Sequence, residues 1–264
     1  MKLLLLSLLF CLASALPAVA AEKTRVLLIW HKHDHPPGTH MYEEASRLLA
    51  HCLQQTPDVE AVLSDGWPAD AETLKGVKAV VLYTSPGAEI VLDPSHRAAA
   101  EKLFAEGAGL TAIHWATGAS ETTGPEWMKL LGGWFNHPLF SRLQVTTTKL
   151  MQADPKHPIS RGWKEYDLRD EYYLVLRFQP EAKPVLKATV NGQEYVVGWT
   201  YERPGSRGGR SYGLVLGHFW DCFQEEAFRK LVVNGILWTA HRDVPADGAP
   251  VKAAVEEFLR VSER

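Results

Sequence analysis

The stretch Thr24-Arg-Val-Leu-Leu-Ile-Trp30 ends in a continuous apolar run, which is typical of a strand buried on both faces of a sheet. Similar short apolar runs recur along the chain, and segments with helical spacing of apolar residues separate them. This alternation predicts an α/β fold with a mostly parallel central sheet flanked by helices. The further predicted strands are 59–63, 78–83, 109–114 and 212–217, and the predicted helices are 41–55, 94–106 and 225–241.

The middle of the chain has a different pattern, which predicts an added β-hairpin region. Residues 142–148 alternate in polarity, and their threonines favour a strand with one wet face. Asn191-Gly192 is a hairpin signal between two of the short strands predicted at 172–178, 185–190 and 195–201. Without a repeat or a clear linker, we expect residues 22–264 to form one domain, with a polar tail over 243–264 and a short helix at 251–261.

Composition and charge narrow the class of protein. The 264 residues are 46% hydrophobic and 22% charged, which is the composition of a folded globular protein and not of a disordered chain. Twenty-eight basic residues against 31 acidic ones give a formal net charge of −3. Because no broad cationic field is present, we expect no nucleic-acid partner.

The first residues have the three-part pattern of a secretory signal peptide. Met1-Lys2 is a short positive start, residues 3–12 are almost entirely apolar, and Ala18-Val19-Ala20 is a small-x-small cleavage signature. We therefore expect residues 1–21 to be removed and the mature protein to be periplasmic or secreted, without a membrane segment; an uncleaved anchor is the alternative. Cys52 and Cys222 remain in the mature chain, and the sequence leaves open whether they form a disulfide.

Histidines mark one edge of the predicted sheet. Because parallel strands end at the same edge, where open α/β sheets bind ligands, histidines that follow such strands are expected to lie close together. A histidine-rich loop after the first strand adds further imidazoles, the commonest ligands of zinc and similar metals. No closed-site metal motif is present, so a polar loop that contacts substrate is the alternative. The strand-end residues are His31, His114 and His218, and the predicted metal ligands, for Zn²⁺ or Mn²⁺, are His31, His33, His35 and His40.

A carboxylate and several aromatic residues are further candidates. Glu171, in Arg169-Asp170-Glu171-Tyr172, precedes an apolar strand and is a candidate general acid or base; a surface charge cluster is the alternative. Aromatic rings near the histidines suit the apolar faces of sugars, although such rings are more often part of the core. The predicted substrate-binding residues are His40, Trp115, Phe219 and Trp220. The glycine-rich nucleotide motifs are absent from the sequence, which argues against a nucleotide-binding enzyme.

Together these segments resemble the ThuA-like (trehalose utilisation) family over residues 25 to about 241. The resemblance rests on the first strand with its loop to His40, on Gly109-Leu-Thr-Ala-Ile-His114, on Asp170-Glu171-Tyr172, and on Leu216-Gly217-His218 with the helix that follows. It implies a flavodoxin-like fold similar to class I glutamine amidotransferases. His114 stands where those enzymes carry their cysteine nucleophile, so the resemblance implies the fold without the amidotransferase chemistry.

The resemblance also implies a site made of His40, His114, Glu171 and His218, and a role in carbohydrate metabolism beside oxidoreductases that make 3-keto sugars. We expect an exported enzyme that hydrolyses, eliminates or isomerises a glycoside or its 3-keto derivative, with metal assistance. His114, Glu171 and His218 are the expected catalytic residues. The partner is a small-molecule carbohydrate, and the sequence is compatible with a homo-oligomer. The alternatives are a non-catalytic sugar-binding accessory protein and a metal-handling protein that relies on the loop 31–40.

Overall fold

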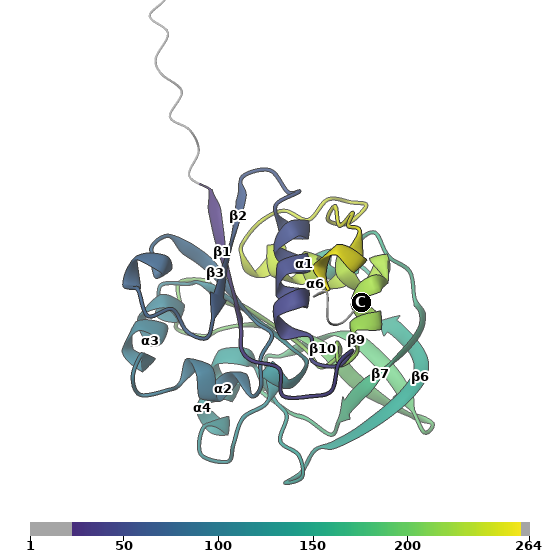
Figure 1. The fold of residues 1–264 in the computed structure, drawn as a ribbon. Coiled ribbons are helices and arrows are strands. Elements are labelled where there is room, and N and C mark those ends of the chain that lie inside the picture. Colours follow the sequence, from purple (N-terminus) through teal and green to yellow (C-terminus); the bar gives the residue numbers. More distant parts are fainter. Residues whose placement is uncertain (1–22, 260–264) are drawn as a thin grey trace, which may run out of the picture.

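The computed structural model describes residues 23–259, which form a nine-stranded sheet covered by helices (Figure 1). The strand order is β2-β1-β3-β4-β11-β10-β9-β6-β7. The first five strands in that order run parallel, as the apolar runs predict. These are β1 (Thr24–Trp30), β2 (Val59–Asp65), β3 (Val77–Leu82), β4 (Gly109–Ile113) and β11 (Arg210–Leu214).

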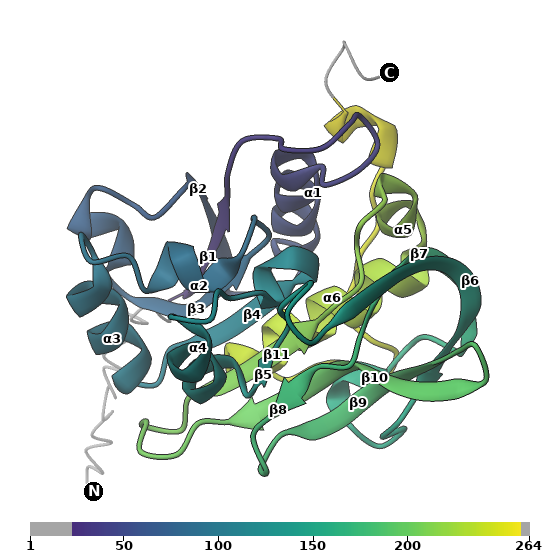
Figure 2. The same ribbon diagram turned by 90° about the horizontal axis from the view of Figure 1, so that it is seen from below.

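Helices cover both faces of this parallel half, because each has an apolar stripe to bury. Helices α1 (Tyr42–Leu53) and α6 (Glu226–Thr239) lie on one face, and α2 (Gly87–Val91), α3 (Arg97–Ala105) and α4 (Gly124–Leu131) lie on the other (Figure 2). Helix α6 is buried along almost its whole length, and Gly109 allows its close approach. A Cβ at Gly109 would lie 2.2 Å from the Thr239 carbonyl oxygen.

The sheet continues beyond β11 as an antiparallel half. Its strands are β10 (Gln193–Glu202), β9 (Lys183–Val190), β6 (Arg142–Gln152) and β7 (Tyr166–Leu174), and β7 is the outer edge. Asn191 and Gly192 form the predicted tight turn between β9 and β10, with φ angles of 51° and 77°. A two-stranded sheet of β5 (Gly133–Trp134) and β8 (Arg177–Phe178) lies beside this half.

Several expected boundaries are wrong. The strand predicted over 172–178 is split between β7 and β8, because Val175 turns the chain with a φ of 60°. The tail contains only the 3₁₀ turn Val255–Phe258 within its described part. The predictions missed α2, α4 and α5 (Trp220–Gln224); the first and last have only five residues each, too few to display a helical period. The signal segment 1–21 lies outside the described residues.

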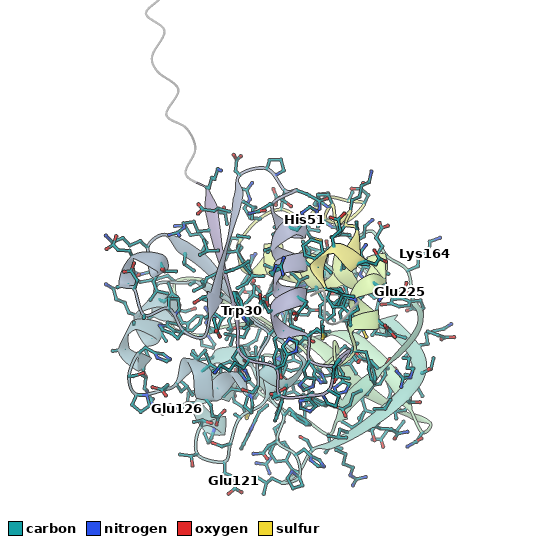
Figure 3. All side chains as sticks on the ribbon, viewed as in Figure 1. Trp30, His51, Glu121, Glu126, Lys164 and Glu225 are labelled. Carbon is teal, nitrogen blue, oxygen red and sulfur yellow. The ribbon has the colours of Figure 1, made fainter. Side chains whose placement is uncertain are left out.

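Three smaller observations complete the fold. Cys52 and Cys222 are buried, free thiols, so they do not form the disulfide that the sequence left open. No described helix is long and apolar enough to cross a membrane. Exposed charged side chains such as Glu121, Lys164 and Glu225 lie on the periphery of the molecule (Figure 3).

Candidate active site

Three histidines meet at the carboxyl-terminal edge of the parallel strands. His40 ends the loop that follows β1, His114 comes directly after β4, and His218 lies four residues beyond the end of β11. His40 and His114 have φ angles of 47° and 54°, a conformation uncommon for residues other than glycine. Such backbone is retained mainly where it aims a side chain, and here it turns both rings toward the same point.

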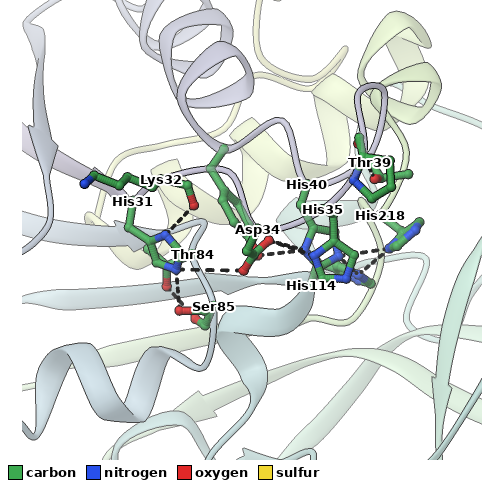
Figure 4. A network of polar contacts seen from close by, with 12 residues as sticks. His31, Lys32, Asp34, His35, Thr39, His40, Thr84, Ser85, His114 and His218 are labelled. Carbon is green, nitrogen blue, oxygen red and sulfur yellow. Dashed lines mark hydrogen bonds and ion pairs between the residues drawn. The ribbon is translucent and has the colours of Figure 1, made fainter.

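The three rings present one nitrogen each to a common centre (Figure 4). Nε2 of His40 lies 2.9 Å from Nδ1 of His218 and 3.1 Å from Nε2 of His114. Nε2 of His114 is 3.2 Å from Nδ1 of His218. Zn–N bonds of about 2.0–2.1 Å would place two nitrogens of a tetrahedral site about 3.4 Å apart, so the three nitrogens need to move only slightly to hold an ion.

Hydrogen bonds on the far side of two rings fix which nitrogen carries the proton. Nδ1–H of His114 donates to the carbonyl oxygen of Val215 at 2.7 Å, so Nε2 is left with its lone pair. Nδ1 of His40 faces the carboxylate of Asp34 at 3.2 Å and the hydroxyl of Tyr42 at 2.7 Å. A ligating histidine almost always donates its other N–H to a carboxylate or a carbonyl, and both rings show this pattern.

Burial keeps the imidazoles neutral, as metal ligands must be. Burial, with further contributions from the other histidines, lowers the pKa of His40 to about 3. Burial and the neighbouring His35 and Arg169 lower the pKa of His218 to about 4. The pKa of His114 lies well below its ordinary value for the same main reason. The donor set therefore fits a divalent ion of the zinc or manganese kind.

Two side chains of β7 complete the site from the antiparallel half. Oε2 of Glu171 lies 3.6 Å from Nε2 of His114 and 3.5 Å from Nδ1 of His218. The hydroxyl of Tyr173, on the same face two residues later, is 3.0 Å from Nε2 of His114. Burial raises the pKa of Glu171, which makes its carboxylate a better proton acceptor.

A cavity of about 160 Å³ opens onto this cluster, and His35, Trp115, Glu171 and Tyr173 line it. The ring of His35 lies against that of His40, with centroids 3.7 Å apart and planes tilted by 33°, and its Nδ1 faces the Asp34 carboxylate at 2.7 Å. This pair leaves the other nitrogen of His35 available for proton transfer. A larger cavity of about 540 Å³ lies at the opposite edge, near the starts of β3 and β4, but the three converging nitrogens are not there.

The predicted metal ligands of the loop divide into two sets. His35 and His40 lie together with Asp34, in a second group of possible ligands whose atoms are within 4.8 Å of one another, whereas His31 and His33 lie apart. Nε2 of His31 hydrogen-bonds Ser85, and Nε2 of His33 lies 2.9 Å from the carboxylate of Glu44, so neither joins the cluster. Of the four loop histidines, only His40 contributes a nitrogen to the three-histidine group. The period-2 spacing of the loop does not bring all four rings to one place, because they point to different partners.

The predicted substrate-binding aromatics also divide. Trp115 lines the cavity, and Phe219 lies beneath the guanidinium of Arg169, 4.3 Å from its ring centroid. Trp220 is only 4% exposed and packs beside Phe223, so it is part of the core and not of a sugar platform. Sequence reasoning did not single out Asp34, Tyr42 and Tyr173. Tyr173 could have been found, since it lies two residues from Glu171 and must share its strand face.

Fold and site together define an α/β protein with a three-histidine centre at the carboxyl edge of its parallel strands. The ThuA family profile, described as trehalose utilisation, matches residues 25–239, and the chain belongs to this family. The expected fold class is thereby confirmed.

Two ThuA-like proteins of known structure share this fold. A ThuA-like protein of Bacteroides uniformis is 18% identical with a TM-score of 0.62, covering 90% of this chain and 99% of that one. A ThuA-like protein of Parabacteroides merdae is 15% identical with a TM-score of 0.62, covering 88% and 96%. A glutamine amidotransferase of Thermotoga maritima is 13% identical with a TM-score of 0.44, covering 82% and 98%. No curated protein gives a significant match.

Proposed function

We propose that this protein is a metal-assisted enzyme that acts on a glycoside or its 3-keto derivative, outside the cytoplasm. The observation that carries the proposal is the convergence of three imidazole nitrogens to within 2.9–3.2 Å of one another, beside a carboxylate that lines a cavity. Membership of a family described by trehalose utilisation supports a carbohydrate substrate. The signal pattern of residues 1–21 supports export.

The residues suit proton abstraction next to a ketone. A keto group at carbon 3 of a sugar acidifies the C–H bond at carbon 2. The Glu171 carboxylate can accept that proton, and the freed electron pair forms a double bond between carbons 1 and 2 as the glycosidic oxygen leaves carbon 1. The leaving oxygen takes a proton, and His35 in its imidazolium form, with Nδ1 held by the Asp34 carboxylate, is placed at the cavity to donate the proton of Nε2.

His40, His114 and His218 would hold a divalent ion, which supplies Lewis-acid polarisation of the substrate. Tyr173 forms the wall of the cavity next to Glu171, and its hydroxyl would be free to face the cavity once Nε2 of His114 binds an ion. Addition of water after elimination gives net hydrolysis, and isomerisation would begin with the same proton removal. The proposal therefore assigns metal binding to His40, His114 and His218, and proton transfer to Glu171 and His35.

Metal content and turnover test this proposal together. Elemental analysis of the mature protein without a histidine tag should give nearly one zinc, manganese or similar ion per chain, and the His114→Ala variant should lose it. The loaded protein should release the leaving group from a 3-keto glucoside and not from the parent glucoside. A wild type that stays metal-free after divalent ions are added would contradict the metal assignment. Sugar binding without turnover by a loaded protein would favour the accessory-protein alternative.

A further inference from the structure

Asp170 is a buried carboxylate that the proposed chemistry does not use. Its relative exposure is 0%, and no lysine or arginine of the described residues forms an ion pair with it. Burying a charge without a cation is costly unless hydrogen bonds compensate for the lost water. A buried carboxylate of this kind is retained where it fixes the position of the groups that donate hydrogen bonds to it.

Three backbone N–H groups at the site donate to Asp170, and the Cys222 thiol is a further hydrogen-bond partner. Oδ2 accepts the N–H of Gly217 at 2.6 Å, and Oδ1 accepts the N–H of His218 at 3.0 Å. Oδ1 also accepts the N–H of Glu171 at 2.9 Å. The Asp170 carboxylate thus hydrogen-bonds the backbone of His218, which contributes Nδ1 to the cluster, and the backbone of Glu171, the candidate base.

The position of Asp170 in the sheet makes this grip unusual. It lies on β7, the outer edge, whereas Gly217 follows β11 near the centre of the sheet. Strands β10, β9 and β6 separate the two in the strand order, so no backbone ladder joins β7 to β11. The sheet curls until β7 reaches the end of β11, and Asp170 bridges that gap directly.

The turn at Gly217 is held from its other side as well. Gly217 has a φ of 110°, which a residue with a side chain rarely adopts, and the Tyr83 hydroxyl donates to its carbonyl oxygen. The N–H groups of the turn are therefore fixed by Asp170 and its carbonyl by Tyr83. His218 inherits its orientation from this double restraint.

We propose that Asp170 is a positioning residue whose carboxylate sets the distance between Glu171 and Tyr173 on β7 and the imidazole of His218. This inference rests on the proposed metal site and deepens it. It predicts that Glu171 and Tyr173 move away from His218 when Asp170 loses one of its acceptor oxygens, even though Asp170 touches neither metal nor substrate.

Asp170→Asn is the direct test, because asparagine keeps the shape but points an N–H donor at a backbone N–H. Zn²⁺ affinity, measured by competition with a chelator, should fall about 10- to 100-fold, as for other residues that orient ligands. The absorption spectrum of the Co²⁺-loaded variant should differ from that of the wild type. Asp167→Asn, an exposed change on the same strand, is the matched control and should leave both readouts unchanged.

A double-mutant cycle separates positioning from simple destabilisation. If Asp170 acts by placing Glu171, then Glu171→Gln should reduce kcat much less in the Asp170→Asn background than in the wild type. Additive effects on kcat, or a folded Asp170→Asn variant with wild-type Zn²⁺ affinity and Co²⁺ spectrum, would overturn the inference. Metal that binds as predicted without any turnover would instead count against the proposed reaction alone.

Tyr83→Phe keeps the test decisive if Asp170→Asn does not fold. It removes only the hydroxyl that holds the Gly217 carbonyl, and we expect a several-fold loss of Zn²⁺ affinity. Wild-type affinity and an unchanged Co²⁺ spectrum in a folded Tyr83→Phe protein would then overturn the inference.

Discussion

The parallel and antiparallel halves of the sheet contribute to the site in different ways. In the parallel half, the segments after β1, β4 and β11 end at one edge and bring His40, His114 and His218 together. In the antiparallel half, β7 presents Glu171 and Tyr173 from the face of a strand. The histidine nitrogens lie on segments that follow parallel strands, and the strand order brings these segments to one edge of the sheet. The position of the proton-transfer group Glu171 depends instead on how strongly the antiparallel strands curve toward that edge.

The largest expected effect tests the division between binding and proton transfer. Glu171→Gln removes the candidate base but keeps its size, so turnover of a 3-keto glucoside should fall about 10²- to 10⁴-fold. Metal content and sugar affinity, measured by elemental analysis and calorimetry, should stay near the wild-type values. Wild-type turnover in Glu171→Gln would show that Glu171, on the antiparallel half of the sheet, is not the base.

The second prediction concerns which histidines bind metal. His114→Ala should weaken Zn²⁺ binding by more than about 100-fold, because loss of a ligand exceeds the 10- to 100-fold cost of losing a residue that orients one. Control substitutions of His31 and His33, whose partners are Ser85 and Glu44, should change the affinity far less. The reverse ranking in chelator competition would move the metal site to the loop and support the metal-handling alternative.

A third prediction uses the pH dependence of stability of the metal-free protein. Burial lowers the pKa of His218 to about 4, below the value of about 6.5 expected when unfolded. Between these values the unfolded chain binds a proton that the folded chain does not, so this group's stabilisation is present above pH 6.5 and lost on acidification.

The measurement is urea unfolding of wild type and His218→Gln at pH 7 and pH 5. The free energy of unfolding of the wild type should fall by about 2 kcal/mol more than that of the variant over this range. Burial raises the pKa of Asp170 to about 7, which acts in the opposite direction but is common to both proteins and cancels in the comparison. Equal changes in both proteins would mean that His218 is not desolvated as described.

The smallest expected effect comes from Tyr173→Phe. The ring keeps its stacking on Phe135, with centroids 3.7 Å apart, but loses the hydroxyl that donates to His114. Stability should fall by about 1 kcal/mol and Zn²⁺ affinity should change little, since an ion and this hydroxyl compete for the same lone pair. Thermal unfolding and chelator competition check this. A loss of turnover as large as that of Glu171→Gln would show that Tyr173 itself transfers a proton.

Patterns within single segments were enough to predict the parallel half. The apolar run at residues 24–30 and the helical stripe over 41–55 place their elements nearly as observed, because a doubly buried strand and a one-sided helix leave clear periods. The boundary near Val175 could not be predicted in the same way. Its φ of 60° is uncommon for a β-branched residue, so the residue type gives no sign of it.

The sequence by itself determined the fold class, the family, and the arrival of His114 and His218 at one edge, because strand order along a parallel sheet dictates where its loops meet. Tertiary structure alone gave His31 and His33 partners away from the three-histidine group and buried Trp220 in the core. It also placed Asp170 across the gap between β7 and β11. These choices depend on the path of a loop and the curl of a sheet, which arise from long-range packing and hydrogen bonding and leave no period in the chain.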